Sequence, residues 1–158
     1  MLKIVSGILI TIISTILGRK AVKSHSDRLS FYKSLCEFNS TLLKDLSFKR
    51  NGVAEAFEKN YYFEDFNDCL KCVKERFFNG KETIINRRYL KDGERREIEV
   101  YFGEIGKYSS ITETDYLKQK GEEFAEIVKA SEEKTKKFLS LGPKLGFTLG
   151  IVVFILIL

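Results

Sequence analysis

Two apolar runs, one at each end, set the strongest limit on what this chain can form. The first, Leu2 to Gly18, has 17 residues and one charge, Lys3, at the end where its stem reaches the headgroups. That length just suffices to cross about 30 Å of hydrocarbon as a helix. The second, Leu145 to Leu158, has only 14 residues and reaches 20 with the preceding LSLGPK. We expect both to be transmembrane helices, and whether the shorter run spans fully is left open.

Basic residues flank both runs on the side that faces the middle of the chain. They include Arg19, Lys20, Lys23, Lys136, Lys137 and Lys144. Cytoplasmic flanks of membrane helices are rich in Lys and Arg, so we expect the residues between the runs to lie in the cytoplasm. A cleaved signal peptide is disfavoured, because two basic residues stand where a small-residue cleavage site is required.

Small residues recur at helical spacing in both runs. They are Gly7, Thr11, Ser14 and Gly18 in the first, and Gly142, Gly146 and Gly150 in the second. In lipid, such faces let helix backbones approach closely, so the antiparallel runs are expected to pack as a hairpin. Small residues are also common in membrane helices in general, and this alternative stays open.

The residues between the runs have apolar positions at helical intervals. Helices are predicted from about Asp27 to Leu46, over Val53 to Lys59, from Phe63 to Phe77 and from Glu113 to Leu141. The first is free to continue from the membrane run, since nothing between Arg19 and Asp27 breaks a helix. The expected fold is all-α: a helical bundle at 21–141 between transmembrane helices at 1–20 and 142–158, with a bend at Pro143.

The stretch from 83 to 102 is ambiguous. Asp92-Gly93 is a strong hairpin signal, and Ile98, Val100 and Phe102 alternate as in a strand. Over a longer window the apolar positions fit a helix that Asp92 caps, and we favour this helix.

Gly103 and Gly106 lie three residues apart beside Ile105 and are expected in the exposed interior of that helix. Each glycine costs about 1 kcal/mol there relative to alanine, which demands a reason. We expect another helix to cross close to the backbone at this point. It belongs either to the same domain, the favoured case, or to a partner.

Groups that carry chemistry are sparse. Cys69 and Cys72 have the spacing of half a zinc or redox site, but no second ligand pair exists and the single histidine, His25, is distant in sequence. We expect both to be buried or half-buried thiols. No Gly-rich phosphate loop followed by Lys and Ser/Thr is present. The sequence therefore predicts no catalytic residue, no metal and no cofactor.

Two clusters of charged residues are interpreted as ordinary surface and not as binding sites. Asp92, Glu97, Glu99 and Glu104 are expected to form a solvated helix face, with a weak cation site left open. The basic and aromatic residues at 87–89 lack any nucleic-acid-binding module, so no nucleic-acid partner is expected. The net charge of +5 is modest, and only the flanks of the apolar runs are positioned for anionic lipid.

Several short motifs resemble the stage III sporulation protein AB family. They are the opening MLK with an apolar helix to Gly18, the closing KLGFTLG from Lys144, the pattern LKD…EI from Leu90 to Ile98, FGEIGK from Phe102, and VAEAF from Val53. The resemblance covers all 158 residues. The sequence departs from the family at Gly52 and Ala54, where prolines are usual, and at Leu43, where an acid is expected.

The resemblance implies an endospore-forming bacterium, with the protein in the mother-cell membrane around the forespore. It implies a non-enzymatic platform in a secretion-like channel complex, docking a secretion-type ATPase beside other stage III sporulation membrane proteins. The soluble part is similar to the platform domain of type II secretion, and a homo-oligomer is left open. The alternative is a lipid-regulated, membrane-anchored adaptor unrelated to sporulation.

Overall fold

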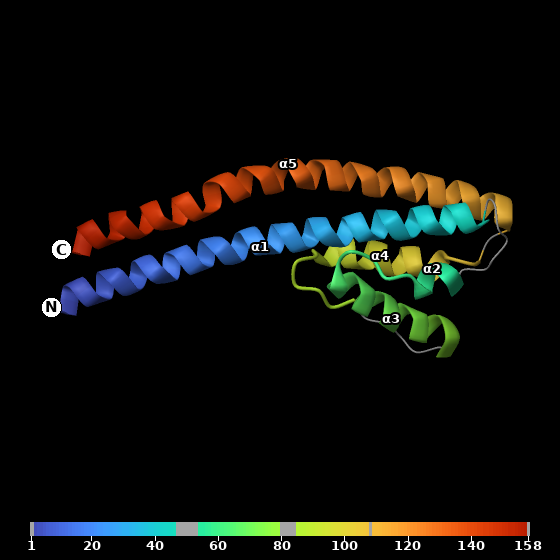
Figure 1. Ribbon diagram of the computed structural model, residues 1–158, viewed down its shortest axis with the longest axis horizontal. Coiled ribbons are helices and arrows are strands. Elements are labelled where there is room, and N and C mark those ends of the chain that lie inside the picture. The colour runs from blue at the N-terminus through green and yellow to red at the C-terminus, as the bar shows by residue number, and fades with distance from the viewer. Residues whose placement is uncertain (1, 47–53, 80–84, 108, 158) are drawn as a thin grey trace. The chain divides into compact units, whose positions relative to one another are not determined.

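The computed structural model describes residues 2–46, 54–79, 85–107 and 109–157, and its elements are all helices (Figure 1). They are α1 (Leu2–Lys44), α2 (Ala54–Glu58), α3 (Glu64–Asn79), α4 (Asp92–Glu104) and α5 (Ser110–Ile157). No strand occurs among these residues. The expected all-α class is therefore confirmed.

The chain forms two compact units, each built partly from the two long helices. Unit 1 comprises Met1–Asp27 and Ala130–Leu158, and unit 2 comprises Arg28–Lys129. Helix α1 runs without a break through the expected boundary at 20/21, as the absence of helix breakers predicted. Helix α5 likewise continues through 141/142 and past Pro143. Neither long helix therefore ends at the boundary that was expected between a membrane segment and the soluble domain.

Unit 2 has a core rich in aromatic side chains. Helix α1 contributes Phe31, Leu35, Phe38 and Leu42, which recur every three or four residues and are fully buried. The ring of Phe38 lies 5.3 Å from that of Phe57 and 5.6 Å from that of Phe102. Since such edge and tilted pairs add to the energy of burial, Phe38 ties α1 to both α2 and α4.

Helices α2 and α3 match the predicted apolar stripes. Ala56 and Phe57 are buried in α2, and α3 buries Phe66, Cys69, Leu70 and Val73. Between the two helices, the Asn67 side chain accepts from the Tyr61 N–H at 2.8 Å and donates to the Tyr61 carbonyl at 2.8 Å. Two ends of the predicted helices, Val53 and the side chain of Phe77, lie outside the described residues.

Helix α4 settles the ambiguous stretch in favour of a helix over 92–104. The predicted cap was off by one residue, because Asp92 is already helical and Lys91 occupies the N-cap position. Glu94 closes this end by accepting from the Lys91 N–H at 3.0 Å. Its carboxylate also pairs with Arg28 of α1, so one side chain both caps α4 and joins it to α1.

The start of α5 also differs from expectation. The helix was predicted to begin at Glu113, but α5 begins at Ser110. The Ser109 and Thr112 hydroxyls lie 3.1 Å apart, and the Glu113 N–H donates to the Ser109 carbonyl at 2.9 Å. Ser109 thus stands immediately before the first helical residue, and its carbonyl accepts a backbone bond from the first turn.

Candidate functional site

Unit 1 is a pair of antiparallel helical segments, the terminal parts of α1 and α5 (Figure 1). We call it the helix pair. The ring of His25 stacks on Phe138 at 4.3 Å, and Gly18 lies across from Leu145 at a shared pocket. Positions on α1 therefore decrease as positions on α5 increase. The antiparallel arrangement expected of the two runs is confirmed.

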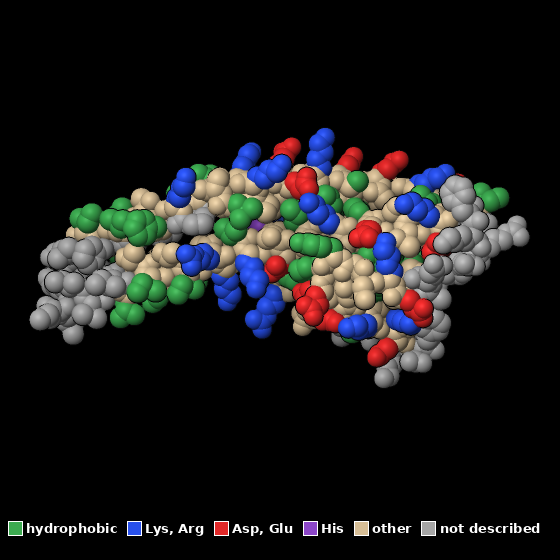
Figure 2. Space-filling view, viewed as in Figure 1, with side chains coloured by type: hydrophobic (Ala, Val, Ile, Leu, Met, Phe, Trp, Pro, Cys, Tyr) green, Lys and Arg blue, Asp and Glu red, His purple; other side chains and the backbone are tan. Residues whose placement is uncertain are grey.

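Large apolar side chains cover the outside of the helix pair (Figure 2). On α1 the residues that are more than half exposed are Leu9, Ile12, Ile13, Ile16 and Leu17. On the α5 part of the helix pair, the described apolar side chains that are more than half exposed are Leu139, Leu141, Leu145, Phe147, Leu149 and Ile155. Exposed apolar surface of this continuity marks contact with a membrane or a partner.

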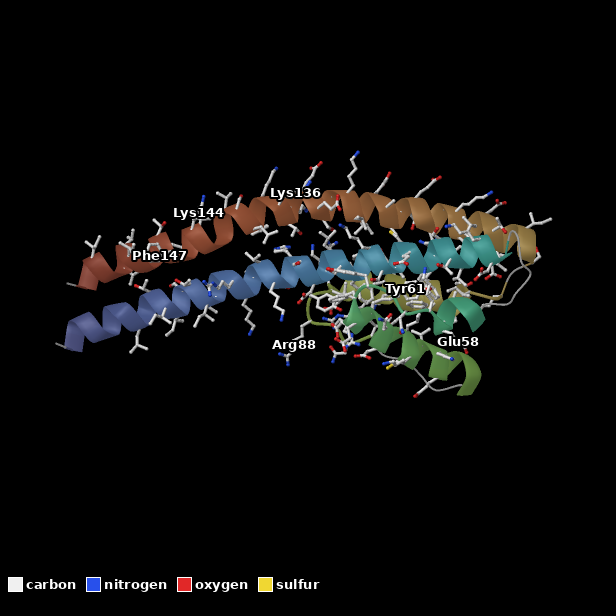
Figure 3. All side chains as sticks on the ribbon, viewed as in Figure 1. Glu58, Tyr61, Arg88, Lys136, Lys144 and Phe147 are labelled. Atoms are coloured by element: carbon white, nitrogen blue, oxygen red, sulfur yellow. The ribbon has the colours of Figure 1, made fainter. Side chains whose placement is uncertain are left out.

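Basic side chains lie next to this apolar surface. All six residues of the predicted orientation signal are exposed, and Figure 3 shows Lys136 and Lys144 extending from α5. The sequence contains no Asp or Glu at 1–26 or at 134–158. Between each chain end and the nearest acidic residue, Asp27 or Glu133, the helix pair is thus apolar and its only charged side chains are positive.

The predicted small-residue face is described in part. Thr11, Ser14 and Gly18 are half-buried. Gly7, Gly142, Gly146 and Gly150 lie within α1 or α5, but their surroundings fall outside what the structure describes. The packing role of this set stays a prediction. Among the described residues, no helix combines the length and the hydropathy that crossing a bilayer requires.

The cysteines are placed unfavourably for thiol chemistry. Cys69 is buried as predicted and Cys36 is half-buried, whereas Cys72 is exposed, which contradicts the expected burial. Burial raises the pKa of the Cys69 thiol to about 12 and that of Cys36 to about 11. A nucleophilic or metal-binding cysteine needs the opposite shift. Within the described ranges, no three His, Cys, Asp or Glu residues gather as a metal site.

The acidic residues around α4 have separate roles. Asp92 and Glu97 are exposed, as the solvated-face interpretation expects. Glu99 accepts from the Ile85 N–H at 3.0 Å, and Glu104 pairs with Lys107 at 3.0 Å. Glu99 thus holds the segment that leads into α4, and Glu104 closes its end.

The basic and aromatic residues at 87–89 hold unit 2 together. Tyr89 donates to the Asp65 carboxylate at 2.8 Å, and Arg87 pairs with the same carboxylate at 3.3 Å. Desolvation by burial, with the hydrogen bond to Asp65, raises the pKa of Tyr89. Arg88 is exposed (Figure 3). Two of the three side chains therefore fasten the approach to α4 onto α3.

The two-glycine prediction needs correction. Gly103 lies in the last turn of α4 and is half-buried, and Ile105 is buried in the core. Gly106 lies beyond the helix with φ 80°, a left-handed conformation that glycine adopts without strain. Its N–H donates to the Glu113 carboxylate of α5. The expectation that Gly106 sits in a helix interior was wrong, and a crossing helix at Gly103 stays a prediction.

The close helix approach that the structure does show occurs at Gly121. A Cβ atom placed there would lie 2.9 Å from Asn39 Nδ2 of α1. Asn39 is buried, donates to the Leu117 carbonyl of α5 at 2.8 Å and accepts from the Tyr101 hydroxyl at 2.9 Å. Sequence reasoning missed this contact, although an isolated glycine inside a predicted helix was a signal that could have found it.

Comparison with known proteins identifies the family of this chain. No curated protein matches it significantly, and neither does any solved structure. One family model, stage III sporulation protein AB, matches residues 3–158. This span includes both long helices and all of unit 2, as the resemblance in the sequence implied. The chain therefore belongs to the stage III sporulation protein AB family.

Proposed function

We propose that the protein is a non-enzymatic, membrane-anchored component of the sporulation assembly between mother cell and forespore. In this role unit 2 is a cytoplasmic platform that docks a secretion-type ATPase. Membership of the family makes it a stage III sporulation protein of an endospore-forming bacterium. The family is one of structural and assembly proteins and not a known enzyme family. The observation that carries the anchoring is the apolar, basic-flanked helix pair.

The apolar surface supplies the free energy of anchoring. The five exposed side chains of α1 are each 51–60% exposed. At about 1.5–3 kcal/mol for burial of a whole large apolar side chain, covering them contributes on the order of 4–8 kcal/mol before α5 is counted. Counted with all their residues, the runs at 2–18 and 139–158 are long enough to form two helices that hold the protein in a membrane.

Charge supports the direction of the anchor. Arg19, Lys20 and Lys23 follow the first run, and Lys136, Lys137 and Lys144 precede the uncharged stretch 145–158 of the second. Both flanks lie on the side of unit 2, which is the cytoplasmic pattern. A membrane protein that positions unit 2 in this way presents it to cytoplasmic partners.

Unit 2 offers a surface for docking at α2 and α3. A pocket of about 220 Å³ lies there, lined in part by Phe57, Glu58, Asn60 and Lys74. Two residues after Asn60, the side chain of Tyr62 is 89% exposed. Tyrosine is one of the residue types enriched among those that dominate binding energy at interfaces. This surface supports the platform role.

Cysteine labelling tests the anchoring. The chain, with Cys36, Cys69 and Cys72 replaced by alanine, is expressed in non-sporulating cells, where the outer side of the membrane faces the medium. Reporters before Lys3 and after Leu158 should then react with an impermeant reagent in intact cells. A reporter at Gly80 should react only after permeabilisation. If the carboxyl-terminal reporter also needs permeabilisation, the short run does not span. If neither terminal reporter reacts in intact cells, the two-anchor proposal is wrong.

Affinity purification tests the platform role. Tagged full-length protein extracted from sporulating cells in mild detergent should bring a membrane-associated ATPase with it. Tyr62→Ala should reduce the bound ATPase activity. Val100→Ala is the matched control, because Val100 is also exposed but lies on α4. If the ATPase is absent from the wild-type eluate, or Tyr62→Ala retains it fully, the docking proposal fails.

A further inference from the structure

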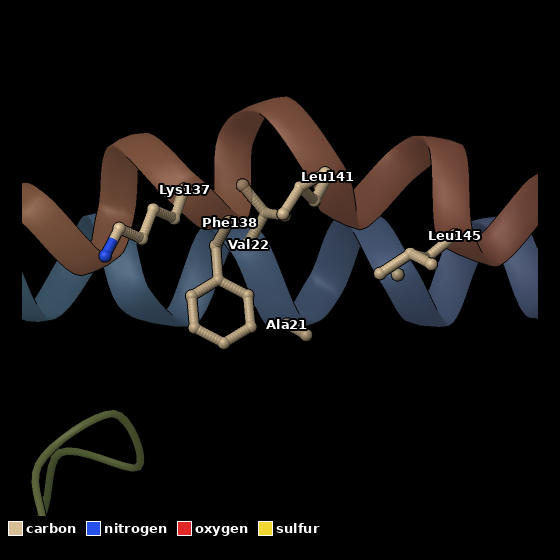
Figure 4. A pocket seen from close by; sticks show the side chains of 7 residues that line it. Ala21, Val22, Lys137, Phe138, Leu141 and Leu145 are labelled. Atoms are coloured by element: carbon tan, nitrogen blue, oxygen red, sulfur yellow. The ribbon is translucent and has the colours of Figure 1, made fainter.

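The helix pair contains an apolar pocket beside its basic residues. The pocket has a volume of about 200 Å³ and an apolar wall (Figure 4). Helix α1 contributes Gly18, Ala21 and Val22, and α5 contributes Phe138, Leu141 and Leu145. The pocket is open on one side, and its wall exposes no polar surface. The pocket therefore suits a hydrocarbon chain and not a polar solute.

Lys137 gives the pocket a charged edge. It lines the pocket, and Figure 4 shows its ammonium group extending away from the apolar side chains. Such a residue packs its aliphatic stem on an apolar wall and keeps its charge in a polar layer. Lys134 and Lys144 lie three residues before and seven after it, which places them on the same face of α5.

The helix pair has three acidic residues, Asp27, Glu132 and Glu133, against eight basic ones, and no acidic residue lies between them and the chain ends. The stretches 1–26 and 134–158 hold eight basic residues and no Asp or Glu: Lys3, Arg19, Lys20, Lys23, Lys134, Lys136, Lys137 and Lys144. A ligand that fits both features needs a hydrocarbon chain and a negative headgroup. An anionic phospholipid has both, whereas a neutral phospholipid matches only the pocket.

We propose that this pocket binds one acyl chain of an anionic phospholipid, with the lipid phosphate at Lys137. The inference rests on the proposed membrane anchoring and deepens it. One basic side chain near a membrane surface favours anionic lipid by about fivefold. Lys137 is therefore expected to account for a preference of that size, with Lys134 and Lys144 on the same face of α5 adding to it.

A tryptophan reporter tests the site directly, since the chain has no tryptophan of its own. Full-length Phe138→Trp is reconstituted in phosphatidylcholine vesicles that contain phosphatidylglycerol, with bromine on the acyl chains of one lipid or the other. Brominated phosphatidylglycerol should quench the pocket tryptophan more than brominated phosphatidylcholine does at equal mole fraction. Lys137→Gln should lower this preference by about fivefold. Lys136→Gln is the matched control, because Lys136 is exposed but does not line the pocket.

A second reporter separates the outcomes. Phe147→Trp lies on the exposed apolar surface of α5, outside the pocket, and should show no preference between the two lipids. Equal quenching by both lipids at position 138 overturns the site and leaves the anchoring intact. Protection of position 138 from both lipids, with position 147 quenched, assigns the pocket to a protein helix and also overturns the site.

Absence of quenching at both positions overturns the anchoring, and the lipid site with it. Phe138→Trp removes the phenyl ring that stacks on His25, which could itself change the quenching. Leu141→Trp repeats the measurement at a second pocket residue and leaves that stacking in place.

Discussion

Replacing Gly121 with alanine should destabilise unit 2, although alanine is the better helix former. In a helix interior the exchange gains about 1 kcal/mol from propensity. At this site, however, the added Cβ would lie 2.9 Å from Asn39 Nδ2, closer than Cβ atoms approach other atoms. Asn39 must therefore move, and it is the residue that joins α1, α4 and α5.

The cost follows from what Asn39 gives up. A buried donor or acceptor that loses its partner costs about 1–3 kcal/mol, and overpacking of a core costs a similar amount. The two costs together, less the gain in propensity, give an expected net loss of about 1–5 kcal/mol. For a domain near 100 residues, each kcal/mol lowers Tm by about 4–8 °C. Unfolding of Gly121→Ala should thus begin several degrees below the wild type.

Near-ultraviolet circular dichroism provides the assay. The chain has no tryptophan, and all seven tyrosines lie in unit 2, so the aromatic signal reports that unit even in detergent. Gly93→Ala is the matched control: nothing lies within 4 Å of its added Cβ, and it should keep or raise Tm. A Tm for Gly121→Ala at or above the wild type would refute the crossing. In an Asn39→Ala background, the penalty of Gly121→Ala should shrink, since the clashing atom is gone.

Two further predictions follow from buried and exposed groups of unit 2. Burial acts to raise the pKa of Glu94, but hydrogen bonds from Arg28 and a backbone N–H lower this pKa below 4.5. The ionised carboxylate therefore stabilises the fold, and Glu94→Gln should have a lower Tm than the wild type above pH 4.5. As the pH falls through the lowered pKa, the Tm of Glu94→Gln should decrease less than the Tm of the wild type. Equal Tm losses in both proteins from pH 6 to 3 would contradict this. A thiol reagent should modify only Cys72 rapidly in the folded protein and all three cysteines after unfolding, while Cys72→Ser should abolish the rapid phase. Rapid labelling that persists in Cys72→Ser would mean that Cys69 is accessible.

The helices were largely predictable because their apolar periodicity is strong. In α1 the spacing of Leu35, Phe38 and Leu42 marks one face, and these residues are buried. In α3 the stripe through Phe66 and Val73 is buried in the same way. The longer helical window over α4 prevailed over the hairpin signal, because packing of Ile98 against the core does not depend on the turn preference of Asp92-Gly93.

Contacts between distant segments were not predictable. Gly103 and Gly106 look equivalent in the sequence, yet one lies inside α4 and the other beyond it. The difference depends partly on Glu113, which accepts from the Gly106 N–H from another helix. From the sequence alone Asn39 would be assigned to the surface, because its two hydrogen-bond partners lie on other helices. Likewise, periodicity alone did not show that Cys72 points to solvent.

The bond between Asn39 and the Leu117 carbonyl joins residues 78 positions apart. During synthesis, the ribosome must therefore add those 78 residues after Asn39 before this bond has a partner. At about 5–20 residues per second, this takes on the order of 4–16 s. For that time the face of α1 that carries Tyr32 and Asn39 has no α5 to pack against it. The growing chain thus passes through a stage in which this face is open to chaperones and to wrong partners.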